Sequence, residues 1–160
     1  MSLLSLSKFE LGERRCFAGE YSWRLKDGEL RYRGSKHYEG LIVGRIPVTE
    51  VRIQKFAAAL DLLDVWHWRN DYHPHELGVE VMDGGSWSFK AEISGRTINA
   101  AGCNAFPAFE DARLSTCNEE RFRLLKAAFY DAFQIDGFIY AAQRQAEIAK
   151  QIQAERDANS

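Results

Sequence analysis

Hydrophobic and polar residues alternate through residues 87–93, where every second side chain is apolar. A period of two is typical of a strand with one buried face and one solvated face. Ser94-Gly95 follows this run, and glycine supplies the positive φ that a two-residue hairpin turn requires. The turn would pair Phe89 with Ala100, so that the apolar faces of both strands coincide. The segment therefore predicts a β-hairpin.

A second alternating run occupies residues 21–25 and is followed by Asp27-Gly28, a strong hairpin signal. This turn would pair Trp23 with Tyr32 and again place apolar side chains on one face. A third strand is expected at residues 78–82, where it joins the later hairpin into a meander.

Weaker patterns mark the rest of the extended structure. Residues 41–46 predict another short strand, ended by Pro47. The first 20 residues show little alternation, and a strand is expected to begin there only at Cys16.

Two segments follow the spacing of amphipathic helices. The first begins after Thr49, a good N-cap, and is expected to run to about Trp66. The second begins after Asn118 and is expected to kink or end at Gly137. The apolar stripes of the two helices consist of Ile53, Phe56, Ala57, Leu60 and Leu63, and of Phe122, Leu125, Phe129, Ala132 and Phe133.

The order hairpin, helix, meander, helix predicts an α+β fold with an antiparallel sheet covered on one face by helices. Residues 1–137 would form one domain, and residues 138–160, rich in Ala, Gln and Glu, a helical C-terminal extension. This extension offers a surface for a homo-oligomer. The uncovered sheet face would be solvated or offered to a partner, and it would carry Arg24, Arg31, Arg33, Lys90, Glu92 and Thr97.

Composition narrows the class of protein. The chain has 160 residues, of which 46% are hydrophobic and 28% charged, as expected for one globular domain. Its net charge of −2 argues against a nucleic-acid partner. The sequence contains no signal peptide and no apolar run near the roughly 20 residues of a membrane span. Three cysteines without a CxxC pair favour reduced thiols, so a soluble cytoplasmic protein is expected.

Three spaced motifs resemble a group of small uncharacterised bacterial proteins. The motifs are Trp68-x-x-x-Tyr72, Asp83-Gly84-x-x-Trp87 and Gly102-x-Asn104-x-x-Pro107, in the order found in that group. The resemblance spans residues 60–125. Where the group usually has Thr and Gln between the glycine and the tryptophan, this chain has Gly85 and Ser86. The resemblance implies the order of the elements and no activity.

The linker between the first helix and the meander is the candidate binding site, because it combines aromatic contact area with charged and polar groups. The meander would bring two turns beside it. The interpretation that the linker aromatics only cover the core stays equally open. The candidate binding residues are Trp66, Trp68, Arg69, Tyr72, His73, His75, Asp83 and Asn104.

Two candidate chemistries are weaker. His67, His73 and His75 suit a borderline metal such as zinc, but their spacing matches no defined zinc signature. We therefore interpret this segment as a solvated polar loop and expect no metal or cofactor. Cys103 has no neighbour in sequence that would lower its pKa, so a small core residue is the favoured interpretation.

These features leave three function hypotheses. The leading one is a non-enzymatic binding protein with a protein partner, for example a toxin-neutralising immunity protein. The second is a metal-dependent hydrolase that uses His67, His73 and His75. The third is a structural subunit that oligomerises through the C-terminal helix.

Overall fold

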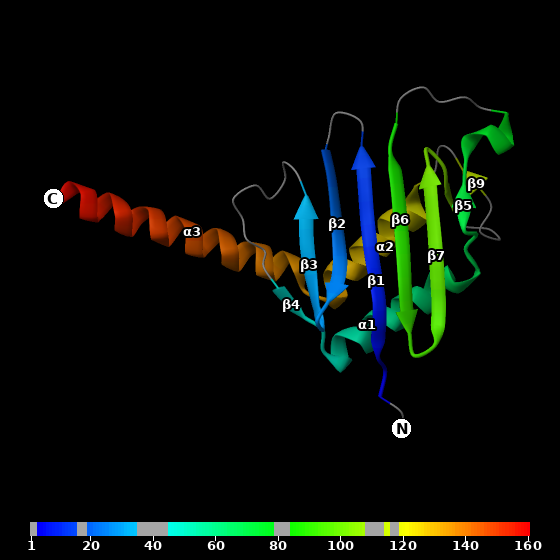
Figure 1. The fold of residues 1–160 in the computed structure, drawn as a ribbon, viewed down its shortest axis with the longest axis horizontal. Coiled ribbons are helices and arrows are strands. Elements are labelled where there is room, and N and C mark those ends of the chain that lie inside the picture. The colour runs from blue at the N-terminus through cyan, green and yellow to red at the C-terminus, as the bar shows by residue number, and fades with distance from the viewer. Residues whose placement is uncertain (1–2, 16–18, 35–44, 79–83, 108–113, 116–118) are drawn as a thin grey trace.

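The computed structural model describes residues 3–15, 19–34, 45–78, 84–107, 114–115 and 119–160. Its main layer is a seven-stranded sheet in the order β4-β3-β2-β1-β6-β7-β5, antiparallel except for the parallel pair β5–β7 (Figure 1). The strands are β1 (Leu6–Arg15), β2 (Gly19–Lys26), β3 (Glu29–Gly34), β4 (Arg45–Pro47), β5 (Asp71–Tyr72), β6 (Ser86–Ile93) and β7 (Arg96–Cys103). The short strands β8 (Phe106–Pro107) and β9 (Leu114–Ser115) form a separate pair.

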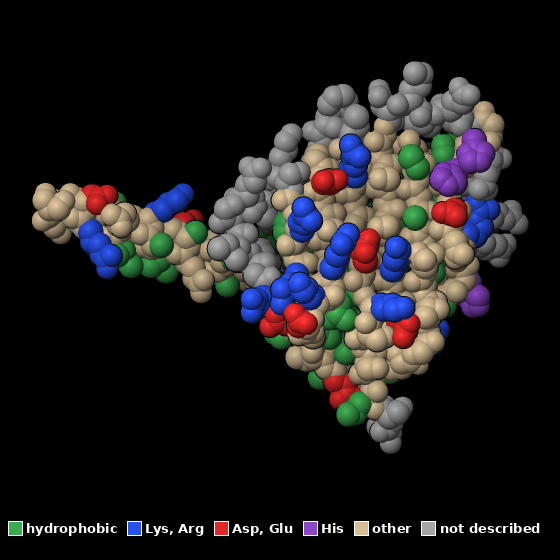
Figure 2. Space-filling view, viewed as in Figure 1, with side chains coloured by type: hydrophobic (Ala, Val, Ile, Leu, Met, Phe, Trp, Pro, Cys, Tyr) green, Lys and Arg blue, Asp and Glu red, His purple; other side chains and the backbone are tan. Residues whose placement is uncertain are grey.

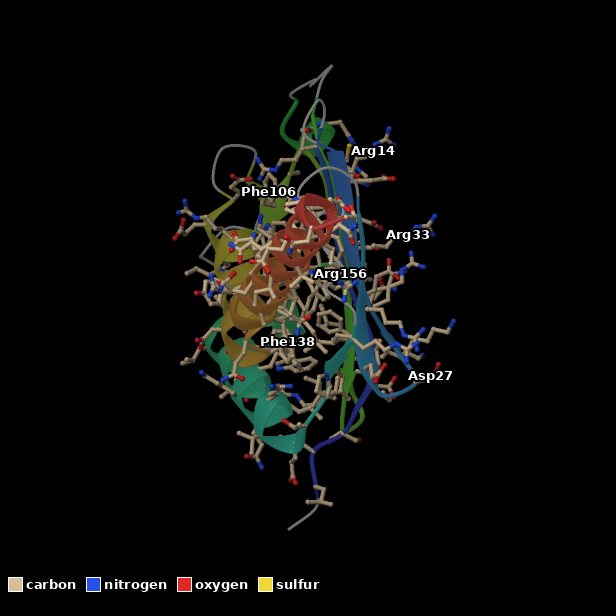
Figure 3. All side chains as sticks on the ribbon, turned by 90° about the vertical axis from the view of Figure 1, so that its left-hand side faces the viewer. Arg14, Asp27, Arg33, Phe106, Phe138 and Arg156 are labelled. Atoms are coloured by element: carbon tan, nitrogen blue, oxygen red, sulfur yellow. The ribbon has the colours of Figure 1, made fainter. Side chains whose placement is uncertain are left out.

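Helices α1 (Glu50–Leu62) and α2 (Glu120–Ala132) cover one face of this sheet (Figure 3). Helix α3 (Ile135–Ala158) begins beside the domain and then extends away from it (Figure 1). The predicted α+β fold, with an antiparallel sheet and helices on one face, is therefore confirmed. No helix in the described parts of the chain is long and apolar enough to cross a membrane.

The registers predicted for the two hairpins are both confirmed. In β6–β7, Phe89 pairs with Ala100, and in β2–β3, Trp23 pairs with Tyr32. The turn residue Gly95 has φ +84°, and Gly28 has φ +75°. The short turns fix both registers because each sits between runs whose apolar residues share a face.

Strand β1 differs from the sequence prediction, which places no strand before Cys16. It occupies the middle of the sheet, between β2 and β6. Phe9 and Leu11 point toward the helices and are buried, but the next residue on that face is Glu13. A carboxylate at an inward position interrupts the alternation, and this hides the strand from a pattern search.

The core lies between the sheet and the two packed helices. Phe9 of β1 stacks on Phe129 of α2 at 4.9 Å between ring centroids and meets Phe56 of α1 at 5.8 Å. Trp23 lies edge-on to Phe129 at 5.6 Å. Aromatic rings from the sheet and from both helices therefore share one cluster, which holds the helices against the sheet.

Two predicted helix ends are wrong. α1 ends at Leu62 rather than near Trp66, because Asp64 adopts a left-handed conformation with φ +53°. The chain turns between α2 and α3 at Gln134, where φ is +54°, and Gly137 lies within α3. Of the remaining predicted elements, residues 79–82 of the third meander strand, residues 41–44, Cys16 and Asn118 lie outside the described residues.

Candidate functional site

The linker after α1 runs along the outer edge of β7. It contains the 3-10 helices η1 (Val65–His67) and η2 (Pro74–Leu77), with β5 between them. β5 pairs in parallel with the end of β7, and the backbone N–H of Ala101 donates to the carbonyl of Asn70 at 2.8 Å. The linker is thus part of the sheet rather than a free loop.

The linker aromatics belong to the core. Tyr72 is fully buried and Trp68 is 4% exposed, and their rings lie 5.8 Å and 6.2 Å from Trp87. Trp66 is half-buried, with its indole N–H bonded to the Asp61 carboxylate at 2.8 Å and the Arg96 guanidinium 4.3 Å from its ring. The interpretation that these residues cover the core therefore describes Trp68 and Tyr72, which present no contact surface to a partner.

The charged and imidazole groups of the linker lie closer to solvent. Arg69 is exposed, its guanidinium carbon lies 5.1 Å from the centre of the Tyr72 ring, and its backbone N–H donates to the Tyr72 hydroxyl at 2.8 Å. Burial of that hydroxyl raises its pKa, despite the opposing effect of the Arg69 contacts. His73 and His75 stack at 5.4 Å between ring centroids.

Asn104 acts as a staple between two turns. Its Oδ1 accepts a hydrogen bond from the backbone N–H of Gly85 at 2.9 Å, and its own N–H donates to the Gly85 carbonyl at 2.9 Å. Next to it, the Trp87 indole N–H donates to the carbonyl of Ala105 at 2.8 Å. The carboxamide oxygen of Asn104 is thus bonded within the fold, and its nitrogen lies 3.9 Å from Cys103 Sγ. Asp83 lies outside the described residues.

The linker histidines have different partners. His67 Nδ1 lies 2.5 Å from a carboxylate oxygen of Asp64, whereas His73 and His75 stack on each other. Among the described residues, no group of three His, Cys, Asp or Glu side chains is placed to hold a metal ion. The metal-dependent hydrolase stays a hypothesis of the sequence analysis. Cys103 is exposed at the end of β7, so the prediction of a core cysteine is wrong.

A shallow hollow crosses the uncovered face of the sheet. Gly12 of β1 lies between Ser22 of β2 and Ser88 of β6, and Ser88 pairs with Ala101 of β7. Gly12, Ser22 and Ser88 of this row line a space of about 640 Å³ together with longer side chains on both sides. The sequence pattern could not reveal this row, since β1 itself was not predicted.

The hollow is lined by three arginines and three glutamates, while Lys and Arg predominate on the face as a whole (Figure 2). On the uncovered face of β1–β4, β6 and β7, Lys and Arg outnumber Glu by two to one, in a chain whose net charge is negative. The cations are Lys8, Arg14, Arg24, Lys26, Arg31, Arg33, Arg45 and Lys90, and the carboxylates are Glu10, Glu20, Glu29 and Glu92.

Four of these cations, Arg14, Lys26, Arg33 and Lys90, have side chains with neither an ion pair nor a hydrogen bond within the described residues. Of these four, Arg14 and Arg33 line the hollow, whereas Arg24, which also lines it, lies 3.7 Å from Glu10. Arg14 and Arg33 project from the sheet on the side opposite the helices (Figure 3). The sequence analysis placed Arg33 on this face and did not find Arg14.

A second, separate cavity of about 340 Å³ lies between α2 and strands β1–β3. The Glu13 carboxylate at its wall is 8% exposed and accepts hydrogen bonds from Tyr21 and Lys126, each at 2.9 Å, and from Arg15 at 2.6 Å. This cavity also depends on the unpredicted strand β1. The sequence signal that could have found it is the position of Glu13 two residues after Leu11, on the same strand face.

Comparison with protein-family models, with curated proteins and with solved structures gave no significant match for this chain. The resemblance carried by the tryptophan, glycine and asparagine motifs stays a prediction. The structure gives these motifs a physical role, because Gly84, Trp87, Gly102 and Asn104 all meet at the staple between the two turns.

Proposed function

We propose that this chain is a non-enzymatic binding module whose uncovered sheet face receives an acidic segment of a protein partner. The observation that carries the proposal is the hollow across the sheet, flanked by Arg14 and Arg33, which have no partner within the described residues. Exposed arginines beside a row of small side chains provide directional donors for carboxylates and room for a chain to approach. A toxin neutralised by an immunity protein is one concrete form of such a partner.

The charge pattern favours a protein over a nucleic acid. Glu10 and Glu20 line the same hollow as the arginines, and they would repel a continuous phosphate backbone. The two aromatic residues that line the hollow, Tyr21 and Trp87, have their rings packed against Tyr32 and Phe122, which leaves little surface on which bases could stack. A mixed surface with excess positive charge suits a protein segment in which carboxylates predominate.

Charge reversal tests the proposal. The double variant Arg14→Glu/Arg33→Glu should lose a protein that the wild type captures from the source lysate. The control Lys150→Glu/Arg156→Glu, on the exposed part of α3, changes the net charge equally and should keep it. The captured protein, once purified, should bind at least tenfold more weakly in 0.5 M than in 0.1 M salt, a span over which surface charges become strongly screened. Equal capture by the two variants, or capture of RNA instead, would contradict the proposal.

A second candidate function is a structural subunit that associates through α3. The observation that favours it is the exposure of Tyr140, Ile148 and Ile152, at 65%, 47% and 45%, on a helix that extends from the domain (Figure 1). Apolar side chains on an extended helix are typical of helix–helix contacts. Light scattering of the full chain should then give a mass above that of the monomer.

A further inference from the structure

The cavity between α2 and the sheet has the size of a small-molecule site. Its volume of about 340 Å³ lies at the lower end of the range for ligand pockets, which begins near 300 Å³. It opens on the helix side of the sheet, away from the hollow discussed above, because its lining residues from β1–β3 face α2. A ligand here would therefore lie on the other face of the sheet from a partner, although Glu13 and Tyr21 line both spaces.

Three tyrosine rings and one alanine form most of the apolar wall. Tyr21 and Tyr32 stack almost in parallel, with an interplanar angle of 13° and 6.3 Å between centroids. Tyr130 lines the α2 side, next to Ala127. Flat rings of this kind favour a planar aromatic ligand, because stacked and edge-to-face ring pairs add to the burial of apolar area.

The wall is held in place by the core behind it. Trp23 is fully buried and lies edge-on to Tyr32 at 5.0 Å and to Tyr130 at 6.5 Å. Two of the three tyrosine rings are thus fixed by one buried side chain. A preformed wall lowers the entropic cost of binding a rigid ligand.

The polar groups of the cavity leave an excess of one positive charge. Lys126 and Arg123 line it, against the single carboxylate of Glu13. Glu13 already accepts three hydrogen bonds, whereas the Lys126 ammonium has three N–H groups and gives one of them to Glu13. Arg123 forms an ion pair with Glu120 and is 66% exposed at the rim. An incoming anion would meet donors that Glu13 does not use.

We infer that this cavity binds a small planar aromatic monoanion, that is, an aryl carboxylate with one or two rings. The rings would lie against Tyr21, Tyr32 and Tyr130, and the carboxylate would accept hydrogen bonds from Lys126 and Arg123. An aryl cation would face the same two positive charges, and a neutral ring would leave the donors without a new acceptor.

NMR titration of the full chain with 2-naphthoate tests the inference, with 2-naphthamide as a neutral ligand of the same shape. We expect saturable shifts of the backbone amides of Tyr32, Lys126 and Ala127, and at least tenfold tighter binding of the acid than of the amide. Equal affinities, or no saturation by the acid at millimolar concentration, would overturn the inference.

Two variants locate the site. Ala127→Trp should fill the cavity and abolish binding of 2-naphthoate, while Ala141→Trp, the same change on the exposed part of α3, should leave binding unchanged. Lys126→Met keeps the length of the side chain and should reduce the affinity for the acid to that for the amide. If Lys126→Met does not fold, the test rests on the comparison of Ala127→Trp with Ala141→Trp. Full binding by Ala127→Trp refutes the site.

Discussion

The Lys126 ammonium lies 2.9 Å from the Glu13 carboxylate and thereby fastens α2 to the central strand of the sheet. Burial of this carboxyl raises its pKa. The hydrogen bonds from Arg15, Lys126 and Tyr21, together with the Lys126 charge, outweigh that effect, so the net pKa of Glu13 is below its ordinary value. Because the group is ionised more readily in the folded than in the unfolded chain, it links stability to pH.

Glu13→Gln should therefore lower stability mainly at neutral pH. Above the ordinary glutamate pKa of about 4.3, the stabilisation from the lowered pKa is fully present, and it disappears as the pH falls through the folded-state pKa. We expect the variant to lose about 1.5–3 kcal/mol of unfolding free energy at pH 7, the range for hydrogen bonds to a charged group. The difference from the wild type should shrink below about pH 4.

Urea unfolding of both proteins across this pH range measures the effect. Glu155→Gln is the matched control, because it makes the same substitution at an exposed position of α3. A difference between wild type and Glu13→Gln that stays constant from neutral to acid pH would contradict the assigned pKa direction.

Gly84 and Asn104 should show strong energetic coupling. A Cβ atom added to Gly84 would lie 1.5 Å from Asn104 Oδ1, so Gly84→Ala should cost about 1–3 kcal/mol of unfolding free energy through overpacking. Asn104 has a positive φ of 53°, which glycine adopts without strain. Asn104→Gly therefore preserves the backbone and removes the clashing side chain. In that background, Gly84→Ala should cost less than half as much, which a double-mutant cycle measures.

Gly137→Ala provides the control for this cycle. A Cβ atom there meets no atom within 4 Å, and the residue lies in α3. The same glycine-to-alanine change should therefore raise stability by about 0.5–1 kcal/mol. If Gly84→Ala is also neutral or stabilising, the turns around Asn104 are packed less tightly than the structure indicates.

Local patterns were sufficient to predict the two hairpins, because a two-residue turn sets the register and one-residue errors would expose whole apolar faces. The same argument placed Arg24, Arg31 and Arg33 on the uncovered face. Positive-φ residues that end helices were missed, since Asp64 and Gln134 have no distinctive sequence signal. Structure that is determined by a turn or by an apolar period could be predicted from the sequence. Structure that is determined by a tertiary contact could not.

The candidate binding site shows how tertiary contacts limit prediction from the sequence. Trp68 and Tyr72 have the composition of an interface, yet β5 draws them into the core by pairing with β7. Glu13 has the appearance of a surface residue, yet it lies on the inward face of β1 because Phe9 and Leu11 do. In both cases strand pairing between distant segments decides exposure, and no local pattern reports that pairing.

Variants in the linker should separate its core residues from its exposed ones. Tyr72→Ala removes a fully buried ring beside Trp87 and should cost about 3–5 kcal/mol of unfolding free energy. His73→Ala/His75→Ala removes a stacked pair nearer the surface and should cost less than about 1 kcal/mol. Chemical denaturation measures both. A small loss for Tyr72→Ala would show that the linker is not part of the core, and would restore it as a candidate contact surface.

Truncation of α3 should have a position-dependent effect. The boundary predicted at Gly137 removes Phe138 and Ile139, which pack against the core, and the Arg52 guanidinium lies 5.4 Å from the Phe138 ring. The 1–137 chain should therefore melt several degrees below the full chain, at about 2–4 °C for each kcal/mol lost. Truncation after Ala146 keeps these contacts and should change the melting temperature by less than about 2 °C.

Calorimetry of the three chains at one concentration measures both effects, and light scattering of the same samples reports association through α3. If the 1–137 chain melts with the full chain, the boundary at Gly137 is correct and the contacts of Phe138 contribute nothing to stability. If the full chain has a dimer mass and both truncated chains have the mass of a monomer, the exposed end of α3 is the contact of the structural subunit.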